Sequence, residues 1–189
     1  VERNKAAAHS PAGPFRGGKC SILEGGTRVG FLARWPGHTP VGKVSDALIS
    51  QVDLPAVFTK IAGGDPADFL KLDSIDTSAA LSGGAGRETL ISSTQGNLLS
   101  IRDARWKFIS GVGAPGKGKK AQGPLVDLLG SESVQANDSR DQSGPRLFDL
   151  QSDPGERSNV AKEHPEVVAR LRALLEAQRA KGVGQPLPN

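Results

Sequence analysis

The sequence predicts an α/β chain in which a glycine-flanked loop and helical segments precede a small antiparallel sheet packed by a C-terminal helix. Three observations predict this order: two glycine pairs beside an apolar run, capped apolar stripes further on, and a period of two followed by a period of 3.6 from Arg87 onward. The 189 residues, 37% hydrophobic and 23% charged, suit one domain or part of a larger protein. Because the chain begins at Val1 and contains no Met, we expect it to be a piece of a longer protein.

The composition argues against several classes of function. No apolar run approaches the roughly 20 residues that cross a bilayer, and no charged-then-apolar export signal opens the chain. The basic residues behind the net charge of +4 are scattered, and with Tyr absent and aromatics at 4% there is no stacking platform for single-stranded nucleic acid. A single cysteine, Cys20, rules out an internal disulfide. We therefore expect neither a membrane nor a nucleic acid as partner.

The first region, residues 1–43, contains a loop with a cation near its centre. Gly17-Gly18 precedes Lys19, and Gly25-Gly26 follows Glu24. Glycines let a backbone turn sharply and approach a ligand closely. The pattern predicts a tight loop that presents a cation to an anion.

A strand is expected after this loop, from Arg28 to Arg34. Its residues Val29, Phe31 and Ala33 share one face by alternation. Trp35-Pro36-Gly37 ends the strand, because proline cannot continue a ladder and glycine allows a turn.

Two helical segments are expected in the next part of the chain. Asp53 is the expected N-cap of the first, Pro55 lies in its first turn, and Gly63-Gly64 stops it. The apolar stripe of this helix is formed by Val57, Phe58 and Ile61. A shorter helix is expected from about Asp76 to Ser82, closed by Gly83-Gly84. We interpret both as packing elements.

From Arg87 onward, short runs with a period of two predict an antiparallel meander. The runs are Glu88–Thr94, Asn97–Arg102 and Arg105–Ser110, joined by Gln95-Gly96 and Asp103-Ala104. Trp106 and Phe108 are expected on one face. Residues 111–123 are rich in glycine and lysine and predict a mobile loop, whereas Arg146–Leu150 predicts a fourth strand.

The last part of the chain predicts a turn and a helix. Asp153-Pro154-Gly155 is typical of a turn, because proline presets φ and glycine accepts a positive φ. Pro165 is expected at the first position of the helix. Its apolar stripe, which we expect to be buried on the sheet, is Val167, Val168, Leu171, Leu174 and Leu175.

Lys19 is the residue whose surroundings most favour a chemical role. A lysine ammonium is a compact charge that can hold a sulfate-like or phosphate-like oxyanion, and stabilising charge on a transferring group is often the largest catalytic effect. On spacing alone, the alternative is a surface cation beside a flexible turn, with Glu24 and Arg28 as a local ion pair. The histidines His9, His38 and His164 have no recognisable partner motif, and no motif for a self-contained metal or nucleotide site is present.

Four spaced motifs carry a resemblance to a known enzyme family. The run Arg16-Gly17-Gly18-Lys19, followed by Glu24-Gly25-Gly26, Arg28-Val29 and Arg34-Trp35-Pro36-Gly37, closely resembles the second signature of the formylglycine-dependent sulfatases, the arylsulfatase branch of the alkaline phosphatase superfamily. Later segments of that family are similar to Ser45–Pro55, Leu99–Ile109, and Leu147–Glu156 with Asn159.

This resemblance implies an α/β, alkaline phosphatase-like fold of which the chain is the C-terminal part. One strand of the large sheet and a small antiparallel sheet packed by a C-terminal helix are then expected. Residues 1–83 would end the catalytic domain, 84–182 would form a C-terminal subdomain, and 183–189 would be a disordered tail.

The resemblance also implies roles for the residues of the loop. It makes Lys19 a catalytic residue that binds the sulfate group of the substrate. The scaffold of the loop would be Gly18, Glu24, Gly25, Gly26 and Arg28. Calcium and formylglycine are implied as cofactors, but their residues are not in this chain, and no metal ligand is expected here. Cys20 cannot be the formylglycine precursor, because Ile22 and Glu24 stand where proline and arginine are required.

The implied partners are a sulfate ester substrate and the N-terminal half of the enzyme, so we expect no turnover by the isolated chain. One alternative is a noncatalytic module that holds sulfated polysaccharide with the basic loop around Lys117. Another is a phosphoesterase relative, because phosphate and sulfate are similar tetrahedral oxyanions. The ester is left open among aryl sulfates, sulfated sugars and glycosaminoglycan fragments. A periplasmic or secreted location is expected if the full-length protein carries a signal peptide.

Overall fold

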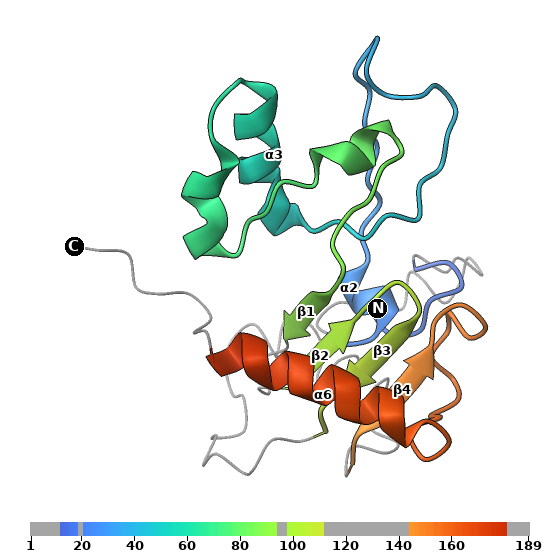
Figure 1. The fold of residues 1–189 in the computed structure, drawn as a ribbon. Helices are drawn as coiled ribbons and strands as arrows, with labels where there is room; N and C mark the ends of the chain where they lie inside the picture. Colours follow the sequence, from blue (N-terminus) through green and yellow to red (C-terminus); the bar gives the residue numbers. More distant parts are fainter. Residues whose placement is uncertain (1–11, 19–20, 94–97, 112–143, 181–189) are drawn as a thin grey trace, which may run out of the picture. The chain divides into compact units, whose positions relative to one another are not determined.

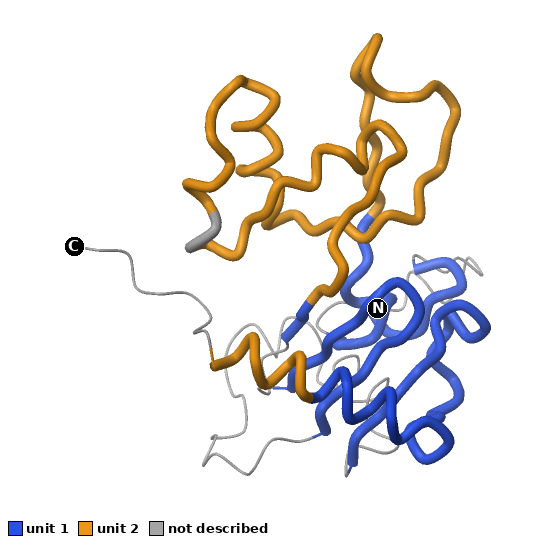
Figure 2. Tube along the Cα trace, viewed as in Figure 1, with its two compact units in different colours: residues 1–29, 91–172 blue, residues 30–90, 173–189 orange. Residues whose placement is uncertain are grey.

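The computed structural model of the chain describes residues 12–18, 21–93, 98–111 and 144–180. They fall into two compact units (Figure 2). The first unit comprises residues 1–29 and 91–172, and the second comprises residues 30–90 and 173–189. The domain boundaries expected from the resemblance stay a prediction.

A four-stranded sheet is the centre of the first unit (Figure 1). Its strands lie in the order β1 (Leu90–Ser93), β2 (Leu99–Arg102), β3 (Trp106–Ile109) and β4 (Arg146–Asp149). Strands β2, β3 and β4 pair antiparallel, with Ile101 opposite Phe108 and Phe108 opposite Leu147. The predicted meander and its fourth strand are therefore confirmed. The predicted Gln95-Gly96 connection and most of the predicted glycine- and lysine-rich loop lie outside the described residues.

The helix α6 (Pro165–Ala180) begins at the predicted proline, and its first half belongs to the sheet-containing unit. The Arg172 guanidinium lies 5.7 Å from the Phe108 ring centroid, and the Trp106 ring lies 4.8 Å from that of His164. Trp106 and Phe108 therefore share the face of the sheet that the helix covers, as predicted (Figure 1). Of the predicted stripe, Leu171 is fully buried and Leu175 is 3% exposed, but Leu174 is 38% exposed, so the prediction is wrong for Leu174.

The opposite face of the sheet holds the core that positions the glycine-flanked loop. Its buried cluster is formed by Ile22, Leu23, Ile109, Phe148 and Leu150, with Leu98 packed against it. Burying such side chains contributes roughly 1.5–3 kcal/mol each, so this cluster is a substantial anchor. The loop is thus held on the face of the sheet that α6 does not cover.

The second unit contains short helices: η1 (Gln51–Asp53), α3 (Leu54–Ile61), η2 (Pro66–Leu72) and η3 (Ser78–Ser82). The predicted first helix is confirmed as α3, with a proline in its first turn. The predicted second helix is a 3-10 helix, and Gly83 after it has a φ of +90°, which suits glycine. Helix η2 was not predicted. Among the described residues, no helix is both long and apolar enough to span a bilayer.

The predicted strand from Arg28 to Arg34 is wrong for this structure. None of those residues is in a strand, and a four-residue helix, α2 (Glu24–Thr27), precedes them where a loop was expected. A strand is defined by its ladder partners, and the sheet of the described chain runs only from β1 to β4. Leu32 is accordingly fully exposed and Val29 is 64% exposed.

The turn before the last helix is present, but its strained residue is not the expected one. Glu156 donates its N–H to the Asp153 carbonyl at 3.1 Å, which closes the predicted turn. The positive φ lies at Glu156 (52°) and not at Gly155. Residues other than glycine rarely adopt this backbone conformation.

Candidate functional site

The loop around Lys19 is closed on itself by its backbone. The N–H of Ser21 donates to the Gly18 carbonyl at 2.9 Å, and the N–H of Gly25 donates to the Arg16 carbonyl at 2.8 Å. Lys19 lies between the first two of these residues, outside the described residues, as does Cys20. The structure therefore fixes both ends of the two-residue segment that carries the predicted sulfate-binding lysine.

The two glycines after Glu24 are needed because two stretches of backbone touch there. A Cβ on Gly25 would lie 2.5 Å from the Arg16 carbonyl oxygen, closer than real Cβ atoms come. A Cβ on Gly26 would overlap the carbonyl oxygens of Gly18 and Ser21. Neither glycine has a positive φ. Close backbone approach, rather than the sharp turn that the sequence suggested, is what requires glycine here.

Glu24 is a buried acid that connects the loop to the sheet. Its side chain is 1% exposed, and Arg28 Nε and Arg102 Nη1 each lie 2.5 Å from Glu24 Oε2. Lys107 Nζ lies 3.0 Å from Glu24 Oε1. The local ion pair with Arg28 that the sequence suggested is present, but two cations from the sheet join it.

Lys107 and Glu156 complete this network, and sequence reasoning missed both. Lys107 Nζ lies 3.0 Å from Glu156 Oε1, and both side chains are at most 2% exposed. Glu156 Oε2 accepts the backbone N–H of Glu24 at 2.5 Å. A signal was available for Lys107. Alternation along the strand places the Lys107 side chain on the other face of the sheet from Trp106 and Phe108, where a core packs. A buried lysine needs an acidic partner.

The electrostatics of the two buried acids differ. Burial by itself would raise the pKa of Glu24, but the charges of Lys107 and Arg102, with hydrogen bonds from Arg28 and Lys107, outweigh it and hold the pKa below 4.5. Burial also raises the pKa of Glu156, and there the charge of Lys107 offsets it only in part, so the pKa stays above 4.5. Burial lowers the pKa of Arg102 despite the nearby charge of Glu24. Glu24 is therefore the more firmly ionised acid of the pair.

The residues of the network do not fit a calcium site. Calcium takes six to eight oxygen ligands, whereas the carboxylates of Glu24 and Glu156 are already engaged by cations and a backbone N–H. Across residues 12–18, 21–93, 98–111 and 144–180, no three His, Cys, Asp or Glu side chains gather where a metal could bind.

His38 stacks on Trp35 with ring centroids 3.8 Å apart. His9 is outside the described residues, as is Lys117 of the alternative polysaccharide site.

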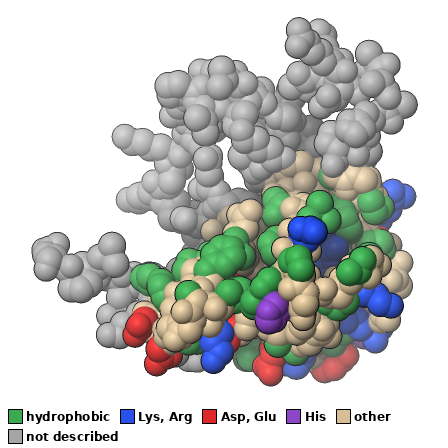
Figure 3. All heavy atoms as spheres, turned by 90° about the horizontal axis from the view of Figure 1, so that it is seen from above, with side chains coloured by type: hydrophobic (Ala, Val, Ile, Leu, Met, Phe, Trp, Pro, Cys, Tyr) green, Lys and Arg blue, Asp and Glu red, His purple; other side chains and the backbone are tan. Residues whose placement is uncertain are grey.

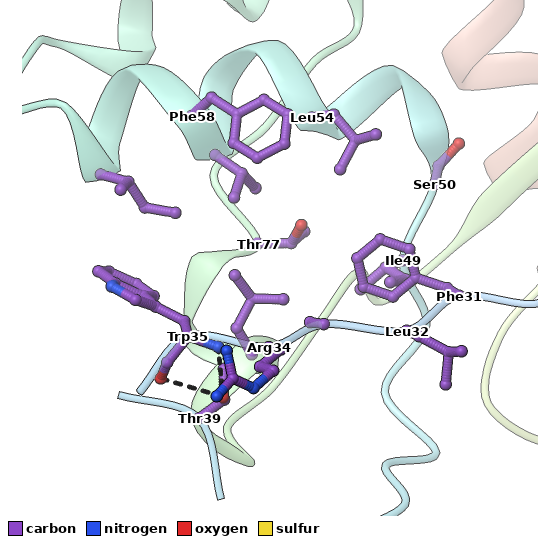
Figure 4. Close-up of a pocket in the computed structure, with 14 residues that line it drawn as sticks. Phe31, Leu32, Arg34, Trp35, Thr39, Ile49, Ser50, Leu54, Phe58 and Thr77 are labelled. Atoms are coloured by element: carbon purple, nitrogen blue, oxygen red, sulfur yellow. Dashed lines mark hydrogen bonds between the residues drawn. The ribbon is translucent and has the colours of Figure 1, made fainter. Parts of the chain in front are cut away.

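The second unit carries an apolar pocket of about 330 Å³. Figure 4 shows Leu54 and Phe58 of α3 facing the segment that bears Phe31 and Trp35. The Trp35 backbone N–H donates to Thr39 Oγ1 at 2.9 Å at the edge of the pocket.

Hydrophobic side chains also reach the surface elsewhere (Figure 3). The exposed large apolar residues of this unit include Leu32, Val41, Val44, Val52 and Leu72. This pocket lacks the convergent charges of the loop, so the loop is the better candidate site.

The curated relatives that the comparison found are named sulfatases. No family model matches the sequence. N-acetylgalactosamine-6-O-sulfatase of Bacteroides thetaiotaomicron is 34% identical over 92% of this chain, and N-acetylgalactosamine-6-sulfatase of Sus scrofa is 31% identical over 94% of it. These stretches make up 31% and 35% of the two relatives, so the chain spans about a third of their length.

Solved structures give the same result. A sulfatase structure from a glycosaminoglycan-metabolism locus of Bacteroides thetaiotaomicron is 32% identical, with a TM-score of 0.72 over 94% of this chain and 34% of that one. A Pseudoalteromonas sulfatase at 21% identity has a TM-score of 0.71 over 93% of this chain and shows the shared fold alone. The predicted fold class, the C-terminal part of an alkaline phosphatase-like fold, is confirmed by these likenesses.

Proposed function

We propose that this chain, which is homologous to the C-terminal part of the sulfatases, contributes a sulfate-binding lysine, Lys19, to the hydrolysis of a sulfate ester. The observation that carries the proposal is the loop itself. Its backbone is closed on both sides of Lys19 and is attached to the sheet through a buried, ionised Glu24. Such an anchor fixes the described backbone on either side of Lys19, and catalysis by charge stabilisation requires a preorganised site.

The proposed chemistry of Lys19 is electrostatic. When a sulfate ester is hydrolysed, the S–O bond to the alcohol breaks and negative charge grows on the leaving oxygen. An ammonium held beside the sulfate group stabilises this charge more in the transition state than in the substrate, and so lowers the barrier. The calcium ligands and the formylglycine that the resemblance implies are expected outside this chain.

The proposed substrate is a sulfated sugar. The two relatives with the identities given above are both named for the 6-sulfate of N-acetylgalactosamine. We take N-acetylgalactosamine 6-sulfate as the first compound to test, beside an aryl sulfate and the corresponding phosphate ester. The phosphate ester tests the phosphoesterase alternative directly.

We expect Lys19→Ala in the intact protein to lower kcat/KM for the sulfate ester by roughly 100-fold to 1,000-fold, the usual effect of removing one charge-stabilising donor. The variant Lys162→Ala, at an exposed position in the same chain, is the matched control and is expected to retain parental activity. Steady-state kinetics with the three substrates measure the effect. Parental activity of Lys19→Ala, or faster turnover of the phosphate ester than of either sulfate ester, would contradict the proposal.

A further inference from the structure

We infer that Lys107 and Glu156 are positioning residues for the lysine loop, acting through Glu24 and helix α2. This inference rests on the proposed function of Lys19 and adds to it two residues that come from the sheet and from the turn before the last helix. They lie far from the loop in the sequence, in two of the later segments that resemble the sulfatases and outside the signature that contains Lys19.

Lys107 and Glu156 connect the sheet to the start of α2. Lys107 reaches from β3 and places its ammonium 3.0 Å from one oxygen of Glu24 and 3.0 Å from one oxygen of Glu156. The other oxygen of Glu156 accepts the backbone N–H of Glu24, which is the first residue of α2. The first N–H groups of a helix have no partner inside the helix, so this bond fixes the place where α2 begins.

Helix α2 in turn contacts the backbone on either side of Lys19. Gly25 and Gly26 of α2 press directly against the carbonyl groups of Arg16, Gly18 and Ser21. These contacts leave no room for even one methyl group. A shift of α2 must therefore move the backbone on both sides of Lys19.

The backbone of Glu156 supports a dedicated role. Its φ of 52° is unfavourable for a residue with a side chain, and such conformations persist where the surroundings hold them. The turn that carries it is also built without its side chain, because Asp153 Oδ2 accepts the N–H groups of Arg157 at 2.6 Å and Ser158 at 2.9 Å. Replacing the Glu156 carboxylate should thus leave the turn formed.

A double-mutant cycle in the intact protein tests the inference. Glu156→Gln keeps the size of the side chain but removes its charge, and we expect it to lower kcat/KM for the sulfate ester by roughly 10-fold to 100-fold, because small misplacements of a catalytic group cost that much. In a Lys19→Ala background the same change should cost less than about twofold, because groups that act through one another are not additive. Glu166→Gln, at an exposed position in the first turn of α6, is the matched control.

The outcomes separate the inference from the proposed function. An equal loss from Glu156→Gln in both backgrounds indicates a general structural role and overturns the inference, as does no loss in the parental background. No loss from Lys19→Ala removes the proposed function itself. If Glu156→Gln does not fold, Glu156→Asp replaces it, because it keeps the charge but shortens the reach of the carboxylate to the Glu24 N–H and to Lys107. Its smaller loss, about threefold, must likewise vanish in the Lys19→Ala background.

Discussion

Lys107 is the residue at which the charges of the loop and of the closing turn meet. Its ammonium is buried between Glu24 and Glu156. Removing one partner of a buried ion pair leaves an uncompensated charge, which costs roughly 3–5 kcal/mol. Both acids contact this lysine, and Glu24 also contacts Arg28 and Arg102. The protonation of the two acids is therefore coupled to the stability of the folded chain.

The raised pKa of Glu156 predicts a pH dependence that the variant Glu156→Gln lacks. A group whose pKa is raised by folding contributes stability that is fully present below pH 4.5 and is lost as the pH rises through the raised pKa. The lowered pKa of Glu24 acts in the opposite direction, below pH 4.5. We expect the unfolding temperature of the parent protein, minus that of Glu156→Gln, to fall as the pH rises above 4.5 and then to level off. A difference that stays constant or increases over pH 4.5–8 would show that the pKa of Glu156 is not raised.

Sequence reasoning at this scale reached only the local part of the network. The Glu24–Arg28 pair is four residues apart and lies on one turn of helix, so spacing suggested it. Lys107 and Glu156 contact Glu24 across 83 and 132 residues. No local pattern encodes such contacts. Lys19 was found because glycines and a cation stand together, and its role stays a proposal.

At the scale of elements, the residue before α3 has a different role from the one that the sequence predicted. Asp53 was expected to cap α3, yet its side chain makes no cap bond to that helix. Instead its carboxylate accepts the N–H groups of Ser50 at 3.1 Å and Ile75 at 3.2 Å, and pairs with Arg87 Nη2 at 2.5 Å. Asp53, the residue before α3, therefore joins three segments of the second unit.

We expect Asp53→Asn to lower the free energy of unfolding of the second unit by about 3 kcal/mol, because Arg87 would lose the partner of a buried ion pair. Asp65→Asn, at an exposed position where the side chain accepts only the N–H of Ala67, should change it by less than about 0.5 kcal/mol. Hydrogen exchange of the amides of α3 measures both. Equal protection in the two variants would show that the ion pair of Asp53 with Arg87 does not stabilise the second unit.

Helices and the antiparallel sheet could be predicted because their signals are local. A proline marks the start of both α3 and α6, and alternation marks β3. Each of these signals predicts its element without reference to the rest of the chain. The stretch from Arg28 to Arg34 has the alternation of a strand but is not one in this structure. Alternation predicts a face to bury, whereas a strand also needs a neighbour, and sequence pattern cannot supply that.

At the scale of the whole molecule, the chain is about a third of the length of its sulfatase relatives. Its first unit presents one loop held by a sheet, a helix and a buried charge network. We propose that this loop forms one wall of an active site. The central claim is that this wall binds a sulfate group through Lys19.

Protection of Lys19 from amine acetylation by inorganic sulfate is the most direct test of that claim. In the intact protein, the acetylation rate of each lysine is followed by mass spectrometry with and without sulfate, and the exposed residues Lys60 and Lys162 serve as internal controls. We expect sulfate to slow the acetylation of Lys19 several-fold, while the rates at the two controls stay unchanged. Equal rates at Lys19 with and without saturating sulfate would contradict the account.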